Sequence, residues 1–224
     1  MKIKQIKVLF AGLLLMVFSM SLSAQKTLEV GLFGGGSYYL GEMNPGIPFV
    51  NTQLAFGALA RLNINDRTAL KLSYSRGNIK GEDPQPLRLI PQDYSFTSVL
   101  NDISFVGEFN WWDYFTGSKR SYFTPYIFAG LGYYFSDLES GVSIPFGFGF
   151  KYSISDRFGL GFEWGMRKTF SDYLDDVNAA DFQTGFDTRG SDQTSTWDWY
   201  NFTGVTLTYK FNLINKTKCN STGF

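Results

Sequence analysis

Large apolar side chains alternate with small or polar ones along almost the whole chain, and this pattern most restricts what the chain can fold into. The segment 142–154 shows it best, because seven apolar residues take every second position and are separated mainly by glycine, serine and lysine. A period of two puts successive side chains on opposite faces of a β-strand. We predict eight strands, at residues 27–41, 53–64, 68–81, 96–111, 122–136, 142–154, 158–170 and 198–211.

The two faces of these strands differ in side-chain size as well as in polarity. One face carries Phe, Leu, Ile, Tyr and Trp, and the other carries Gly, Ser, Ala and isolated charges. Eight strands can close a soluble lipocalin-like barrel or a membrane barrel, but the interior is just wide enough for side chains to fill it. Bulky aromatic residues would overfill that interior, and they would aggregate if they faced water. The sequence therefore predicts an all-β fold, an eight-stranded antiparallel up-and-down transmembrane β-barrel of OmpA/OmpX-like size, with small residues and charges in the lumen.

The connections between the predicted strands alternate in length. Residues 65–67 and 155–157 are tight polar turns, residues 112–121 form a longer aromatic turn, and residues 82–95 and 171–197 are long and polar. Outer-membrane barrels have short periplasmic turns and long external loops, so we expect both termini in the periplasm. Aromatic residues near the strand ends match the girdles of such barrels, namely Tyr38, Tyr74, Trp111, Tyr133, Phe135, Trp164, Phe170, Trp199 and Tyr209.

The first 24 residues resemble an export signal. Three lysines precede an apolar run at 8–20, and small residues lead to Ala24 before Gln25. The run is short for a spanning helix, which needs roughly 20 residues, so a cleaved signal is favoured over an uncleaved anchor. We expect a signal peptide at 1–24, a bacterial outer-membrane barrel at 25–211 and a periplasmic tail at 212–224.

Composition excludes most catalytic chemistry. The chain has no histidine and one cysteine, Cys219, which excludes Ser-His-Asp or Cys-His catalysis, a His-bound zinc site and an internal disulfide. Without the three signal lysines, 20 − 3 = 17 basic residues stand against 20 acidic ones, which gives no basic surface for nucleic acid. We therefore expect no enzyme activity, cofactor, metal or small-molecule substrate. Asp172, Asp175 and Asp176 could hold a divalent cation in an external loop, although a solvated loop is favoured.

Nine charged residues fall on the small-residue face and are expected in the lumen. Five cations nearly balance four anions, and unpaired buried charges are costly, so hydrogen-bonded ion pairs that plug the lumen are favoured over an ion or proton path. Arg61 and Lys71 should lie opposite each other and need a carboxylate, for which Glu108 is the first candidate. Glu29 and Lys210 can meet where the first and last strands close. The full set is Glu29, Arg61, Lys71, Asp102, Glu108, Lys151, Glu163, Arg167 and Lys210.

A barrel with a filled lumen can contact partners only through its rims. The turn at 112–121 combines aromatic side chains with two cations, and aromatic residues and arginine dominate binding hot spots. We predict a partner-binding periplasmic turn made of Trp112, Tyr114, Phe115, Lys119 and Arg120. Insertion of this turn among lipid headgroups is the alternative.

Five stretches of the chain resemble the PorG-type outer-membrane proteins of the type IX secretion system of the Bacteroidota. They are GLFGGGSYYLGEMNP at 31–45, FTPYIFAGLG at 123–132, SIPFGFGFKY at 143–152, WGMRKTFSDYLDDV at 164–177 and DWYNFTGVTLTYKF at 198–211. The likeness covers nearly the entire mature chain, and the stretch at 164–177 is its most specific part. The extension at 212–224 departs from the family pattern.

The resemblance implies a non-enzymatic protein that binds PorK- and PorN-type subunits of the periplasmic ring and helps to tie that ring to the outer membrane. The last strand alternates into Phe211 and resembles the segment recognised by the outer-membrane assembly machinery. The partners expected are therefore outer-membrane lipids and lipopolysaccharide, the ring subunits, and that machinery during biogenesis. A generic OmpA- or OmpX-like structural or adhesion barrel, acting through its external loops, is the alternative.

Overall fold

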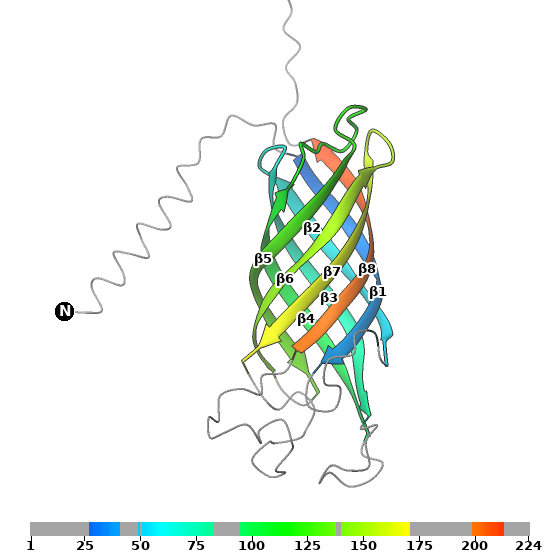
Figure 1. Cartoon of the computed structure of the whole chain (residues 1–224), viewed down its shortest axis with the longest axis vertical. Helices are drawn as coiled ribbons and strands as arrows, with labels where there is room; N and C mark the ends of the chain where they lie inside the picture. Colours follow the sequence, from blue (N-terminus) through cyan, green and yellow to red (C-terminus); the bar gives the residue numbers. More distant parts are fainter. Residues whose placement is uncertain are drawn as a thin grey trace, which may run out of the picture.

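Eight antiparallel strands, paired in chain order, close into one barrel, because β1 pairs with both β2 and β8 (Figure 1). The computed structural model describes residues 27–40, 49, 51–82, 95–137, 140–170 and 199–212. The closed eight-stranded barrel confirms the predicted fold class, and every strand begins and ends within two residues of its predicted bounds. The strands are β1 (Thr27–Leu40), β2 (Gln53–Asn63), β3 (Thr68–Glu82), β4 (Ser95–Asn110), β5 (Phe123–Ser136), β6 (Ser140–Ser153), β7 (Phe158–Thr169) and β8 (Trp199–Asn212).

The three short turns lie at one end of the barrel, together with the start of β1 and the end of β8 (Figure 1, top). In the turn between β2 and β3, Asn65 Oδ1 accepts hydrogen bonds from the backbone N–H groups of Arg67 and Thr68. Between β6 and β7, Ser155 Oγ accepts one from the backbone N–H of Phe158. Asn and Ser side chains favour tight turns because they bond nearby backbone in this way. We call this end of the barrel the turn end.

The outer wall is apolar along its height. Leu32, Leu54 and Leu131 are more than 60% exposed, and most of the exposed large side chains are Phe, Leu, Ile, Val and Tyr on the outward parity of the strands. The strands have 11 to 16 residues, so each has at least the roughly 9–11 that a transmembrane strand requires. Within the described ranges, no helix is long and apolar enough to cross a bilayer.

One member of the predicted aromatic girdle is covered. Tyr38 has no exposed surface, and its ring packs against Phe49 at 5.1 Å between ring centroids. Its hydroxyl also accepts a hydrogen bond from Trp164 Nε1 at 3.1 Å. Tyr38 is therefore a packing residue of the outer wall, in contrast to Trp111 and Tyr133, which are about half exposed.

The lumen contains large aromatic side chains as well as small residues and charges, so the sequence-based description of the lumen was incomplete. A Cβ added at Gly149 would lie 2.7 Å from Tyr126 Cε1, and one at Gly147 would lie 2.8 Å from Phe128 Cζ. Glycines on β6 thus leave the space that rings from β5 occupy. The buried apolar residues form two clusters, one of Tyr39, Ala55, Ile79, Leu100, Tyr134, Tyr200 and Phe202 and one of Val106, Tyr126 and Phe128.

Candidate functional site

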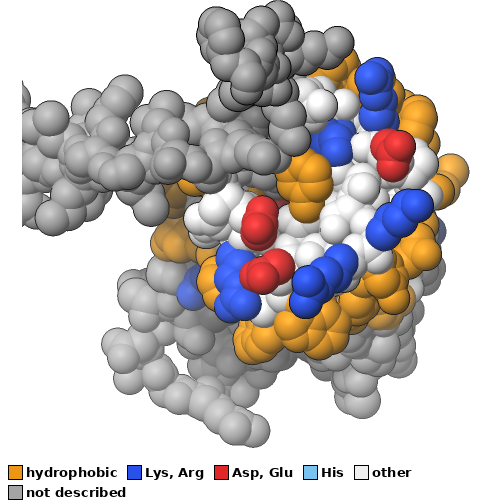
Figure 2. Space-filling model, turned by 90° about the horizontal axis from the view of Figure 1, so that it is seen from above, with side chains coloured by type: hydrophobic (Ala, Val, Ile, Leu, Met, Phe, Trp, Pro, Cys, Tyr) orange, Lys and Arg blue, Asp and Glu red, His pale blue; other side chains and the backbone are white. Residues whose placement is uncertain are grey.

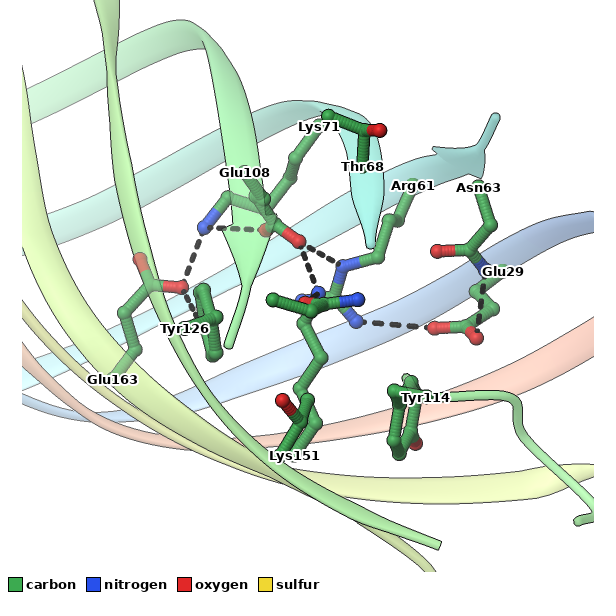
Figure 3. A network of polar contacts seen from close by, with 12 residues as sticks. Glu29, Arg61, Asn63, Thr68, Lys71, Glu108, Tyr114, Tyr126, Lys151 and Glu163 are labelled. Atoms are coloured by element: carbon green, nitrogen blue, oxygen red, sulfur yellow. Dashed lines mark hydrogen bonds and ion pairs between the residues drawn. The ribbon is translucent and has the colours of Figure 1, made fainter. Parts of the chain in front are cut away.

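A network of buried charges fills the lumen in the half nearest the turn end (Figure 3). Glu108 on β4 lies at its centre, with Oε2 2.8 Å from Arg61 Nε and 2.6 Å from Lys151 Nζ, and Oε1 3.4 Å from Lys71 Nζ. Arg61 and Lys71 are direct partners in the pairing of β2 with β3, so the carboxylate of Glu108 separates two like charges. The single carboxylate of Glu108 therefore binds cations from three strands, β2, β3 and β6.

Two further carboxylates extend this network in opposite directions. Glu163 on β7 accepts hydrogen bonds from Lys71 Nζ at 2.5 Å and from the hydroxyl of Tyr126 at 2.8 Å. Glu29 on β1 accepts one from Arg61 Nη1 at 3.0 Å and one from Asn63 Nδ2 at 3.0 Å. The network thus crosses the lumen from β1 to β7, and ring faces shield its cations, as Lys151 Nζ lies 4.4 Å from the centroid of Tyr126.

A separate ion pair, between Arg167 and Asp102, lies farther from the turn end than the network. Arg167 Nε is 3.8 Å from Asp102 Oδ1, and the hydroxyl of Tyr200 donates a hydrogen bond to Asp102 Oδ2 at 2.8 Å. The guanidinium of Arg167 also lies 4.8 Å from the centroid of Phe202, which belongs to the larger apolar cluster. This pair joins the charged half of the lumen to the aromatic half.

Glu29 and Lys210 are neighbours in the pairing of β1 with β8, but their charged groups take other partners. Glu29 contacts Arg61, and Lys210 Nζ donates to the backbone carbonyl of Thr116. The two residues therefore meet at the seam as predicted, but the predicted direct contact between their charged groups is corrected. Its physical reason is the turn between β4 and β5, which inserts between the two side chains.

That turn, residues 111–122, folds into the mouth of the barrel. Thr116 Oγ1 donates to Glu29 Oε1 at 2.6 Å, and the backbone N–H of Gly117 donates to Ser153 Oγ at 2.7 Å. Gly117 has a φ of 93°, which glycine adopts without strain. Tyr114 and Thr116 are both buried. Residues 114–117 thus close the lumen at the turn end, and we call them the cork.

Burial in the cork changes the acidity of a phenol. Desolvation raises the pKa of Tyr114 to about 12, and the negative charge of Glu29 acts in the same direction. A phenol in water ionises near pH 10. The desolvation follows from the position of the side chain, which is only 5% exposed.

The five residues predicted to bind a partner divide into two groups. Trp112, Lys119 and Arg120 are exposed at the turn end. Tyr114 lies in the lumen, and Phe115 is half-buried with Lys210 Nζ 4.4 Å from its ring centroid. The predicted partner-binding turn is therefore corrected for Tyr114, whose ring is buried, and Phe115 offers only part of its ring. Partner binding by Trp112, Lys119 and Arg120 stays a prediction. In Figure 2, which looks onto the turn end, charged groups lie inside a rim of apolar side chains.

A small cavity lies beside the charge network. This cavity, of about 10 Å³ beside Lys71, Glu163 and Arg167, has room for about one water molecule. In the described part of the chain, no group of three or more acidic or cysteine side chains could hold a metal ion. The loop aspartates Asp172, Asp175 and Asp176, the signal segment and residues 213–224 lie outside the described residues.

A closed eight-stranded barrel with a lipid-facing apolar wall and a filled polar lumen is the architecture of an outer-membrane β-barrel. Solved barrels resemble the chain in fold alone. The N-terminal β-barrel domain of Pseudomonas aeruginosa OprF has 13% identity and a TM-score of 0.44, with 84% of this chain and 98% of that chain covered. Neisserial surface protein A has 11% identity and a TM-score of 0.48, with 84% and 98% covered.

A third similar structure is Ail, the attachment invasion locus protein of Yersinia pestis, solved with the heparin analogue sucrose octasulfate. It has 10% identity and a TM-score of 0.48, with 84% of this chain and 99% of that chain covered. A comparison with curated proteins gave no match. A family match, in contrast, extends over residues 7–220, and the chain therefore belongs to the family described as Domain of unknown function (DUF6089).

Proposed function

We propose that this outer-membrane barrel is a non-enzymatic component of the type IX secretion system that anchors the periplasmic ring to the outer membrane. The observation that carries the proposal is the filled lumen, because a barrel without an open bore acts through its rims. The turn end faces the periplasm in this proposal, with both termini on that side, as short turns are periplasmic in such barrels. PorK- and PorN-type ring subunits are the proposed partners.

The exposed side chains of the turn end support a protein contact there. Trp112 is 53% exposed, and Lys119 and Arg120 lie exposed a few residues further along the same turn. The cork fixes this turn from below through Thr116 and Gly117. A preorganised turn binds with less loss of conformational entropy than a flexible one.

Co-purification of ring subunits with the tagged barrel from outer membranes tests the proposal. Trp112→Ala, and separately Lys119→Glu with Arg120→Glu, should lower recovery of ring subunits roughly tenfold, the change that ~1.4 kcal/mol of binding energy gives. Arg76→Glu is the matched control. Arg76 is also an exposed arginine, but it lies in the half of β3 that is farther from the turn end. Heat-modifiable migration of each variant checks that the barrel folds.

Recovery of ring subunits at the wild-type level from both turn variants would contradict the proposed contact. Loss of function only when external residues 178–195 are shortened would instead support the structural or adhesion barrel that acts through its loops.

A further inference from the structure

An open groove of about 430 Å³ lies beside the turn between β4 and β5. Trp112, Tyr122 and Phe123 form its aromatic wall, and Arg67, Asp113 and Arg120 form its polar wall.

The polar wall carries one positive charge in excess. Arg67 Nε lies 2.6 Å from Asp113 Oδ1, so these two side chains largely neutralise each other. Arg120 is exposed and forms no ion pair with any residue that the structure describes. Two arginines and one aspartate give 2 − 1 = +1. A phosphodiester carries the opposite single charge, and a guanidinium can bond two of its oxygens at once.

The aromatic wall continues onto the membrane-facing surface of the barrel. Trp112 and Phe123 have ring centroids 5.8 Å apart, and Phe123 stacks on Phe150 at 6.1 Å with an interplanar angle of 9°. Phe150 in turn contacts Phe148 at 6.5 Å. The groove is therefore continuous with a row of exposed aromatic side chains on the outer wall, which we call the apolar track. Acyl chains of the bilayer contact this wall.

We propose that this groove binds the headgroup of a phospholipid in the leaflet nearest the turns. The Arg120 guanidinium holds the phosphodiester, and one acyl chain follows Phe123, Phe150 and Phe148. A protein segment could also satisfy an arginine, but it would have no use for an apolar track that enters the membrane. The groove shares Trp112 and Arg120 with the proposed ring contact, so lipid binding is measured on the purified barrel in the absence of ring subunits.

Native mass spectrometry of the detergent-purified full chain, titrated with phosphatidylglycerol, tests this site. Arg120→Gln should weaken binding of the first lipid about tenfold, because one charge-assisted contact is lost. Lys119→Gln, which removes the same charge from the neighbouring side chain outside the groove, should bind as the wild type does. Inorganic phosphate at the same concentration should not displace the lipid, since it lacks an acyl chain.

Unchanged lipid binding by Arg120→Gln would overturn the assignment, as would full displacement by inorganic phosphate. If Arg120→Gln instead loses ring subunits while lipid binding is retained, the groove belongs to a protein contact. Failure of ring co-purification with the wild-type barrel would contradict the proposed function and leave the lipid result intact.

Discussion

Thr116 and Glu29 are 87 residues apart in sequence and are joined by a hydrogen bond of 2.6 Å at the mouth of the barrel. This bond attaches the turn between β4 and β5 to the first strand, and through Glu29 to the charge network. The mouth is therefore closed by a specific contact and not by crowding alone.

Thr116→Val should destabilise the barrel by ~1–3 kcal/mol, because it removes a hydrogen bond to a buried carboxylate, while Asn63 Nδ2 still donates to the same oxygen. Urea unfolding in lipid, followed by tryptophan fluorescence, gives the free energy of unfolding. Thr116→Ser keeps the hydroxyl and should lose much less. Equal losses for both variants would show that the methyl group matters and the hydrogen bond does not.

Glu108→Gln should cost ~3–5 kcal/mol in the same measurement, since it leaves three buried cations without their shared anion. Asp113→Asn removes a carboxylate from an exposed ion pair and should change stability by less than ~1 kcal/mol. A small effect at Glu108 would mean that water reaches the centre of the lumen.

The cork should stay docked until strongly alkaline pH. In the unfolded chain this phenol ionises near pH 10, the ordinary value. In the folded barrel burial raises the pKa of Tyr114 to about 12, so the phenol stays neutral at pH 10. Its contribution to stability is therefore fully present below pH 10 and is lost between pH 10 and about 12. The ultraviolet titration of wild type minus Tyr114→Phe isolates this phenolate, and a midpoint near 10 would place the ring in water.

Gly149→Ala should destabilise the barrel by ~1–3 kcal/mol, because the new methyl group would meet the backbone oxygen of Phe162 and the ring of Tyr126. Gly34→Ala is the matched control, since nothing lies within 4 Å of a Cβ at that position. The control should unfold as the wild type does or be more stable by up to ~1 kcal/mol. Equal losses at both sites would indicate a general intolerance of strand glycines.

Purified barrel in planar bilayers should show negligible ion current. Replacement of residues 112–121 by a short turn should not change this, because the aromatic cluster around Tyr134 and Tyr200 closes the other half of the lumen. A steady current of porin size from either protein would contradict a filled lumen.

Strand positions and the parity of inward residues could be predicted, because a period of two fixes both the strand and its faces. The pairing of Arg61 with Lys71 could also be predicted, because the tight turn between β2 and β3 sets the register of these two strands. Tyr126 and Phe128 share the inward parity of Thr124, so their burial could have been found by following that face. The judgement that rings would overfill the lumen ignored the glycines opposite them.

The cork could not be predicted from periodicity. Tyr114 and Thr116 lie in a turn, where no alternation tells which side chains face inward, and an aromatic turn at a membrane surface normally contacts lipid or protein. Only the contacts with Glu29 and Ser153, which come from distant strands, decide their direction. The partner of Glu29 was mistaken for the same reason.

Each ring in the smaller apolar cluster occupies volume that a glycine on the adjacent strand leaves open. A Cβ at position 147 or 149 would also lie 2.2 or 2.3 Å from a backbone oxygen of β7, so a smaller residue at 128 or 126 would not by itself make room for one. Homologues should therefore retain both glycines even where the facing ring is replaced. A side chain at 147 or 149 in a homologue should coincide with a changed spacing between β6 and β7.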